Sequence, residues 1–234
     1  MKIIHCKSVA ELNELASEML VNEFREYPHS LVCAATGNSP TGIYRELVRK
    51  QFNIVVENIR FIKLDEWYGL GKDDLGSCEY YLRKNLIEPL EVSPDRYITF
   101  DGLTNDPEQE FKHVRQYLDN NGPIDLAILG LGTNGHIAFN EPADVLQPQP
   151  HLAQLSETSL SHSMITGNGN VITHGMTLGL ADILQAKKII LPVFGKSKRE
   201  IMQRLMEGKV STHLPASFLW LHHDVTCFYC ENDS

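Results

Sequence analysis

The sequence predicts an α/β fold with an open, mostly parallel, Rossmann-like sheet and helices on both faces. Short apolar runs alternate along the chain with longer amphipathic segments, which is the pattern of strands buried between helices. Several of these runs are followed at once by a loop rich in glycine or polar side chains. The 234 residues contain no internal repeat and no linker-like segment, so we expect one domain, residues 1–234.

The first half of the chain contains three predicted strands separated by helical segments. Ser8 and Glu11 have the spacing of a capping box, and the apolar residues that follow recur at helical intervals. A first helix is therefore expected over residues 8–25. Strands are predicted at residues 31–35, 59–64 and 97–100, and further helices from about residue 40 and over residues 77–86.

The second half continues the alternation of strand and helix. Asp106 and Pro107 mark a helix start, because proline favours the first helical position, and the Asn-Asn-Gly run at residues 120–122 ends that helix. Strands are predicted at residues 124–129, 188–194 and 225–230, with an amphipathic helix at residues 196–207 that closes at Gly208.

Four predicted strands are each followed directly by a loop that carries glycine or reactive side chains. These loops are residues 36–40, 65–66, 130–136 and 195–198. In a parallel α/β sheet, ligands bind at the edge where the carboxyl ends of the strands meet. If the four strands are parallel neighbours, all four loops face a single crevice.

The composition limits the partners of the protein. With 21 Lys and Arg against 30 Asp and Glu, the net charge is −9, which disfavours nucleic acids and anionic membranes but allows a small anionic ligand. No apolar run approaches the ~20 residues that span a bilayer, and the start of the chain turns polar too soon for a signal peptide. Five cysteines, an odd number without an export signal, indicate reduced thiols and a cytoplasmic protein.

Cys227 and Cys230 form a lone C-x-x-C motif in a segment that alternates like a strand. A zinc site would need a second pair of ligands, so two cysteines on one strand is the better interpretation. No other cluster in the sequence has the spacing of metal ligands, and we predict no metal site.

Residues 36–40, Thr-Gly-Asn-Ser-Pro, are the first candidate ligand loop. Gly37 lets the backbone approach an anion closely, and Asn38 and Ser39 lie where the next helix offers free N–H groups. A plain tight turn explains the same composition equally well. Lys198 is a candidate counter-charge for a phosphate if its loop shares the crevice, and otherwise an ordinary exposed lysine.

Asp65 and Glu66 place two carboxylates at the end of a strand. Partial desolvation there raises the pKa of a carboxylate toward that of a useful general base, although a helix cap or a solvated acidic pair is the commoner explanation. His136 follows a glycine-rich loop, and Glu141 lies five residues further on. Histidine and carboxylate form a usual proton-transfer pair, and the many polar groups of this loop favour that role over a surface histidine.

Three segments resemble the signatures of the glucosamine-6-phosphate deaminase/isomerase family. They are Ala-Thr-Gly-Asn-Ser-Pro at residues 35–40, Leu-Asp-Glu-Trp at residues 64–67, and Gly-Leu-Gly-Thr-Asn-Gly-His-Ile-Ala-Phe-Asn-Glu-Pro at residues 130–142. They occur in family order over nearly the whole chain. Residues 175–180 and 210–222, together with Asn134, resemble the galactosamine-6-phosphate branch of this family.

The resemblance implies an enzyme that converts a 2-amino-2-deoxyhexose 6-phosphate, in this branch galactosamine 6-phosphate, to a ketose 6-phosphate, here tagatose 6-phosphate, and ammonia. It implies no metal and no organic cofactor, and leaves the oligomeric state open. In this family pattern Asp65 removes the C2 proton, and His136, assisted by Glu141, opens the sugar ring. The residues implied in substrate binding are Gly37, Asn38, Ser39, Glu66 and Lys198.

The sequence departs from the glucosamine enzymes at two places. Asn134 stands where those enzymes usually have an aspartate beside the histidine, and residues 161–165 lack their phosphate-binding arginine. His162 is the candidate to replace that arginine. Three other functions stay open at this stage: a glucosamine-6-phosphate deaminase, a phosphogluconolactonase-like hydrolase and a non-catalytic sugar-phosphate-binding regulator.

Overall fold

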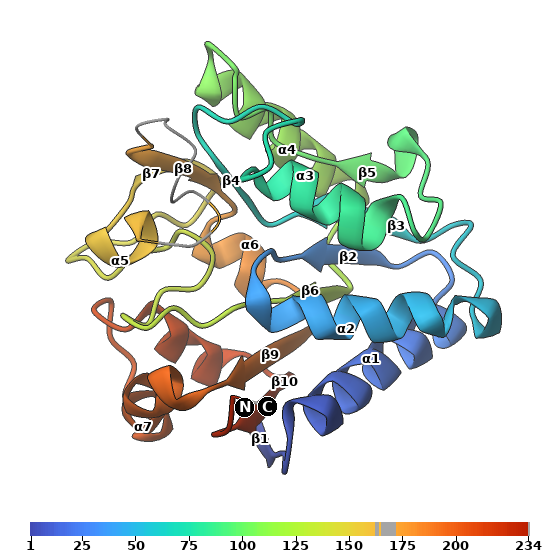
Figure 1. Cartoon of the computed structure of the whole chain (residues 1–234). Coiled ribbons are helices and arrows are strands. Elements are labelled where there is room, and N and C mark those ends of the chain that lie inside the picture. Colours follow the sequence, from blue (N-terminus) through green and yellow to red (C-terminus); the bar gives the residue numbers. More distant parts are fainter. Residues whose placement is uncertain (162–163, 165–171, 234) are drawn as a thin grey trace.

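A seven-stranded sheet, parallel throughout, forms the centre of the structure (Figure 1). The computed structural model describes residues 1–161, 164 and 172–233. In spatial order the strands are β1 (Lys2–His5), β10 (Val225–Cys230), β9 (Lys188–Phe194), β6 (Leu126–Ile128), β2 (Leu31–Ala34), β3 (Arg60–Lys63) and β5 (Tyr97–Ile98). The four strands that precede the candidate loops are therefore contiguous and parallel, as the single crevice requires.

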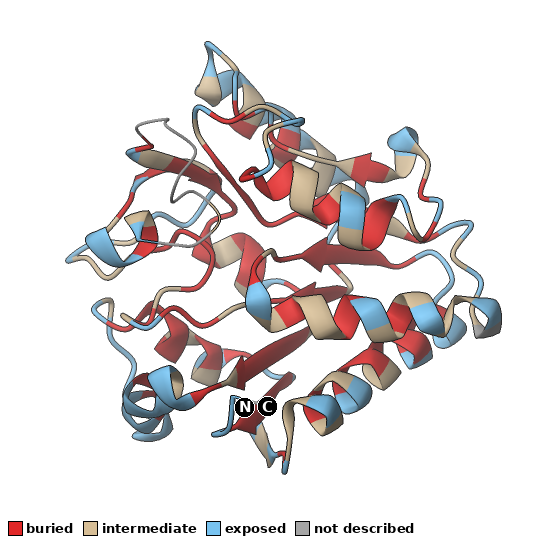
Figure 2. Ribbon diagram, viewed as in Figure 1, coloured by how far each residue is buried: buried red, intermediate tan, exposed pale blue. Residues whose placement is uncertain are grey.

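Helices cover both faces of this sheet, which confirms the predicted α/β architecture (Figures 1 and 2). One face of the sheet is covered by α1 (Val9–Glu26), α2 (Asn38–Arg49), α3 (Cys78–Leu82) and the π-helical turn η2 (Arg83–Ile87). The other face is covered by α4 (Pro107–Asn121), α6 (Leu180–Leu184), α7 (Arg199–Met206) and the 3-10 helix η5 (Pro215–Leu221). Successive residues of a central strand enter different cores, since Leu31 and Cys33 pack on one side and Val32 and Ala34 on the other.

The predicted helix boundaries are largely confirmed. The Ser8 hydroxyl accepts a hydrogen bond from the backbone N–H of Glu11 at 3.2 Å, but the Glu11 carboxylate accepts from Lys7 and not from Ser8, so only half of the capping box forms. Asp106 caps α4, which ends at the expected Gly122. The predicted helix at 77–86 begins as α3 and continues as the π-helical turn η2. The predicted helix at 196–207 begins as the 3-10 turn η4 (Lys196–Lys198) and continues as α7.

The C-x-x-C motif lies in β10, as expected. Cys227 and Cys230 are three residues apart on a strand, so they point to opposite faces and enter different cores. Both are buried and neither is paired in a disulfide. In the described part of the chain, no three His, Cys, Asp or Glu side chains come together as metal ligands. The same residues contain no helix long and apolar enough to cross a bilayer.

The sequence interpretation missed a second, antiparallel sheet and the edge strand β1. This sheet has the order β4 (Asp65–Trp67), β8 (His174–Thr177) and β7 (His151–Gln154), and the short helix α5 (Glu157–Leu160) follows it. Only one residue, Leu64, separates β3 from β4, so Asp65 and Glu66 lie in a strand where we expected a loop. The strands are too short and too polar to have a clear alternating pattern. The remaining short turns are η1 (Gln51–Asn53) and η3 (Pro94–Arg96).

Candidate active site

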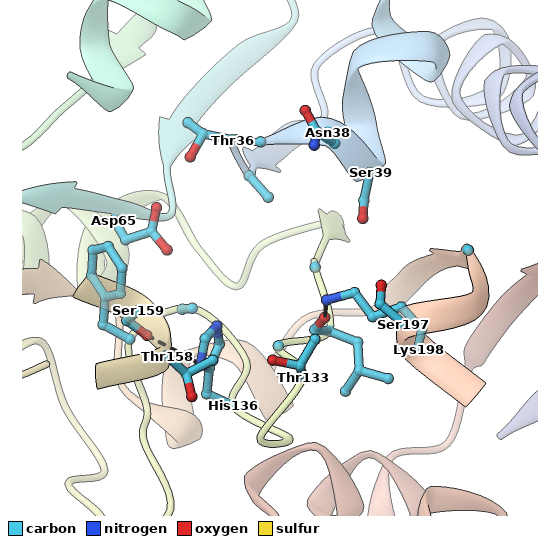
Figure 3. Close-up of a pocket in the computed structure, with 18 of the residues that line it drawn as sticks. Thr36, Asn38, Ser39, Asp65, Thr133, His136, Thr158, Ser159, Ser197 and Lys198 are labelled. Carbon is cyan, nitrogen blue, oxygen red and sulfur yellow. Dashed lines mark hydrogen bonds between the residues drawn. The ribbon is translucent and has the colours of Figure 1, made fainter. Parts of the chain in front are cut away.

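All four candidate loops line one cavity of about 490 Å³ at the carboxyl edge of the central sheet (Figure 3). It is bounded by the segments that follow β2, β3, β6 and β9 and by α5. Figure 3 shows Asp65 and His136 on one side of the cavity, with Ser39 and Lys198 facing each other farther across it. The predicted convergence of the loops is therefore present in the fold.

Asp65 reaches this cavity from the start of β4 and is only 7% exposed. Burial is the main reason that its pKa rises from 3.8 to about 7, and the negative charge of Glu66 raises it further. Lys63 and the thiol of Cys78, whose Sγ lies 3.9 Å from Oδ1, oppose that rise. The result is a carboxylate that exchanges a proton near neutral pH.

Glu66, which we predicted to bind substrate, does not line the cavity. Its side chain is buried on the opposite side of β4, where Oε1 accepts from the backbone N–H groups of Trp67 and Cys78. Its other oxygen, Oε2, accepts from the Lys63 ammonium at 2.8 Å and from the backbone of Glu79. Four hydrogen bonds thus occupy this carboxylate, which anchors the N-terminus of α3.

Lys63 is fully buried and holds this arrangement together behind Asp65. Its ammonium pairs with Glu66 and with Glu79, at 2.8 and 3.0 Å, and donates to the carbonyl of Phe100 at 3.0 Å. Two carboxylates against one ammonium leave a net negative charge close to Asp65. A nearby negative charge disfavours ionisation of Asp65, in the same direction as burial.

The loop after β2 has the form of an anion site. Gly37 has φ 96°, a conformation that favours glycine, and is the N-cap of the twelve-residue helix α2. The first helical residues, Asn38 and Ser39, line the cavity. A helix of this length presents free N–H groups and a partial positive charge at its start.

Lys198 lines the cavity from the end of η4, opposite this helix (Figure 3). Its ammonium donates a hydrogen bond to the carbonyl of Leu131, and desolvation lowers its pKa below the usual value. It is therefore not the ordinary exposed lysine of the alternative interpretation. Ser197 lines the same side of the cavity.

His136 is held by the glycine-rich loop that follows β6. Its ring lies against Gly132, where an added Cβ would come within 2.5 Å of two ring atoms, so a side chain at residue 132 would displace the imidazole. The ring atom Nδ1 lies 3.3 Å from Oε2 of Glu141 and 3.3 Å from the hydroxyl of Ser159. The structure thus brings together the predicted pair, His136 and Glu141.

Glu141 stays ionised in this position. Burial alone would raise its pKa, but the hydrogen bond and charge of His136, with hydrogen bonds from Ser159 and Asn134, lower it to about 2. The side-chain amide of Asn134 donates to Oε2 at 2.8 Å, and its carbonyl accepts from the backbone of His136 at 3.1 Å. Asn134 therefore acts on Glu141 and does not itself line the cavity.

Several residues that line or adjoin the cavity were not predicted, among them Cys78, Thr158, Ser159 and Asp233. Cys78 reaches Asp65 because α3 packs on β4, a contact between distant parts of the chain that has no local signal. Thr158 and Ser159 belong to α5, whose start could have been found from the capping spacing of Ser156 and Ser159. His162 lies outside the described residues.

Comparisons with known proteins agree with these observations. A family model described as glucosamine-6-phosphate isomerases/6-phosphogluconolactonase matches residues 7–228. AgaI of Escherichia coli (strain K12), provisionally named a deaminase, is 40% identical over 218 residues, covering 92% of this chain and 86% of AgaI. Glucosamine-6-phosphate deaminase 1 of Bacillus subtilis (strain 168) is 34% identical over 230 residues, covering 97% of this chain and 95% of that protein.

Solved structures show the same fold. A monomeric glucosamine-6-phosphate deaminase has a TM-score of 0.94 and 34% identity, covering 98% of this chain and 97% of that one. A 6-phosphogluconolactonase from Thermotoga maritima has a TM-score of 0.77 at 17% identity, covering 98% of this chain and 99% of that one, and shares the fold alone. With a family model matched over nearly its full length, the chain belongs to the glucosamine-6-phosphate isomerase/6-phosphogluconolactonase family of enzymes.

Proposed function

We propose that this chain is an amino-sugar-phosphate deaminase/isomerase that converts galactosamine 6-phosphate to tagatose 6-phosphate and ammonia. The observation that carries the proposal is a buried carboxylate, Asp65, with a pKa of about 7, in a cavity that is also lined by the start of α2, by Lys198 and by His136, which pairs with Glu141 behind it. Each chemical step of the reaction is a proton transfer or a hydrolysis, for which these groups suffice.

The phosphate of the substrate binds between the start of α2 and Lys198. Ser39 and the backbone N–H groups of the helix provide donors, and Lys198 provides the opposite charge. Because these groups lie across the cavity from Asp65 and His136, a phosphate bound there directs the far end of the sugar toward the two proton-transfer groups (Figure 3).

Ring opening comes first, since the amino sugar is cyclic in solution. His136 moves the proton between the C1 hydroxyl and the ring oxygen, and Glu141 stabilises and orients the imidazole through Nδ1. Asp65 then takes the C2 proton of the open-chain amino aldehyde while the aldehyde oxygen gains a proton, giving an enolamine. Return of the proton from Asp65 to C1, with loss of one proton from the amino group, yields a ketimine, and one water hydrolyses it to the ketose 6-phosphate and ammonia.

The pKa of Asp65 suits both halves of its task. A base with a pKa near 7 is about half ionised at neutral pH, so it can accept the C2 proton and return a proton to C1 without a large cost in either direction. An aspartate with its ordinary pKa of 3.8 would be ionised but a much weaker base. Burial beside Glu66 therefore supports the assignment of Asp65 as the base.

Two sequence differences support galactosamine 6-phosphate over glucosamine 6-phosphate. Asn134 replaces the aspartate usual in glucosamine enzymes, and residues 161–165 contain no arginine. Glucosamine 6-phosphate is the second candidate, because relatives at 34% identity are named as glucosamine-6-phosphate deaminases. Lactone hydrolysis is less well supported, because it gives no reason for the hydrogen bonds that hold Glu141 against His136.

Parallel assays of three substrates test the proposal. Ammonia release is measured with galactosamine 6-phosphate and glucosamine 6-phosphate, and acid release with 6-phosphogluconolactone. We expect the highest kcat/KM for galactosamine 6-phosphate. Equal or faster turnover of glucosamine 6-phosphate would refute the choice of sugar, and turnover of the lactone alone would refute the deaminase.

A further inference from the structure

The hydroxyl of Ser159 lies between the imidazole of His136 and the carboxylate of Glu141. Its Oγ lies 3.3 Å from Nδ1 of His136 (Figure 3). The same Oγ donates a hydrogen bond to Oε1 of Glu141. The residue is 3% exposed and lines the cavity. One hydroxyl thus contacts both members of the pair to which we assign ring opening.

The two oxygens of Glu141 have different partners, which defines the orientation of the carboxylate. Oε1 accepts from the hydroxyl of Ser159 and from the backbone N–H of Ser156 at 3.3 Å. Oε2 faces Nδ1 of His136 and accepts from the amide of Asn134 at 2.8 Å. Loss of the donors on Oε1 would leave the carboxylate free to rotate away from the imidazole.

Helix α5 is built around this carboxylate. The Ser156 hydroxyl caps the backbone N–H of Ser159 at 3.3 Å and accepts from the amide of Asn134 at 3.2 Å. A helix of four residues has little stability of its own, so it needs such external bonds to keep its position. The orientation of Ser159 and that of Glu141 therefore depend on each other.

We infer that Ser159 is a positioning residue for ring opening: it holds Glu141 so that Oε2 meets Nδ1 of His136. With Nδ1–H donated to Glu141, the other ring nitrogen, Nε2, is the one left to exchange a proton with the sugar. This inference rests on the proposed role of His136. Ser159 therefore affects the reaction of the cyclic substrate, which needs ring opening. It does not affect the later proton transfers by Asp65.

The decisive measurement compares two reactions of the same enzyme. Ammonia release from the cyclic amino-sugar phosphate requires ring opening, whereas deuterium exchange at C1 of the open keto form of the ketose 6-phosphate, with ammonium present, requires only Asp65. For Ser159→Ala we expect forward kcat to fall about 10- to 100-fold, the range for loss of one hydrogen bond to a charged group. Exchange, followed by NMR, should stay within about twofold of the wild type.

Two further variants separate positioning from folding. Ser159→Thr keeps the hydroxyl and should restore most of the forward rate. Ser217→Ala removes an equally buried hydroxyl, bonded to the backbone of Ser211 away from the cavity, and should leave the ratio of the two rates unchanged. A carboxyl NMR titration without substrate adds a readout independent of activity: the pKa of Glu141, about 2, should rise in Ser159→Ala.

The outcomes distinguish this inference from the proposed function. If the wild-type protein releases no ammonia from either amino-sugar phosphate, the proposed function is wrong. The role of Ser159 in ring opening is then wrong as well. Active wild type, with a Ser159→Ala variant that loses forward rate and exchange equally or loses neither, would overturn the inference alone.

Discussion

Replacing Asp65 with asparagine should strongly reduce turnover and yet stabilise the protein at alkaline pH. Burial, and then the charge of Glu66, raises the pKa of Asp65 from 3.8 to about 7. Because the pKa of this carboxyl is higher in the folded protein than in the unfolded chain, its protonated form stabilises the fold. The stabilisation is complete below pH 3.8, the ordinary pKa of the group, and is lost as the pH rises through 7, its pKa in the folded protein. At pH 8 the ionised side chain therefore costs the fold about 4 kcal/mol, from roughly three pKa units at ~1.36 kcal/mol each.

Asparagine cannot ionise, so the variant avoids this cost. Urea unfolding at pH 8 should give a free energy of unfolding higher by up to about 4 kcal/mol, and the gain should shrink as the pH is lowered from 8 to 5. Ammonia release should fall ~10²–10⁴-fold, as for loss of a general base. Asp144→Asn, on an exposed side chain, is the matched control and should change neither property. An Asp65→Asn variant whose stability relative to wild type does not depend on pH would refute the reasoning.

Three other results are expected. The kcat/KM of the wild type should fall about tenfold per pH unit below pH 7, because Asp65 must be ionised, and a profile flat down to pH 5 would contradict this. Lys63→Met removes the ammonium that pairs with the buried carboxylates of Glu66 and Glu79, and it should lower the free energy of unfolding in urea by ~3–5 kcal/mol. Lys50→Met, the control, removes ion pairs with more exposed carboxylates and should lower it by less than about 1 kcal/mol. Lys198→Ala should raise KM, and the inhibition constant of inorganic phosphate, by at least about tenfold, with a smaller effect on kcat. Equal inhibition of the wild type and the variant by phosphate would show that Lys198 does not belong to the phosphate site.

The central sheet could be predicted because its strands are buried on both faces. Runs such as residues 31–35 and 188–194 are apolar throughout, and they alternate with helices that have clear caps. The small antiparallel sheet could not be predicted, because β7 is largely solvent-facing and β4 continues directly from β3. Its position depends on contacts such as Phe139 against Gly175, where an added Cβ would lie 2.3 Å from the ring.

The candidate site was predictable only as far as its loops. Gly37, Asp65, His136 and Lys198 follow central strands, and parallel pairing brings all four loops to one edge. Glu66 does not line the cavity, because adjacent residues of a strand point to opposite faces and Asp65 takes the cavity side of β4, a strand that was not predicted. Whether Glu66 or Asp65 faces the cavity depends on the register of β4, which the sequence does not reveal.

The environments of two carboxylates explain why we assign them different roles. Among the described residues, Asp65 has one weak donor, the thiol of Cys78, and its burial, together with the negative charge of Glu66, raises its pKa to about 7. Burial would raise the pKa of Glu141, but the imidazole of His136, with hydrogen bonds from the Ser159 hydroxyl and the Asn134 amide, lowers it to about 2. A group near 7 can take and return a proton, whereas a group near 2 remains an anion throughout. We therefore propose that Asp65 carries the proton in this reaction and that Glu141 serves as the fixed charge that orients His136.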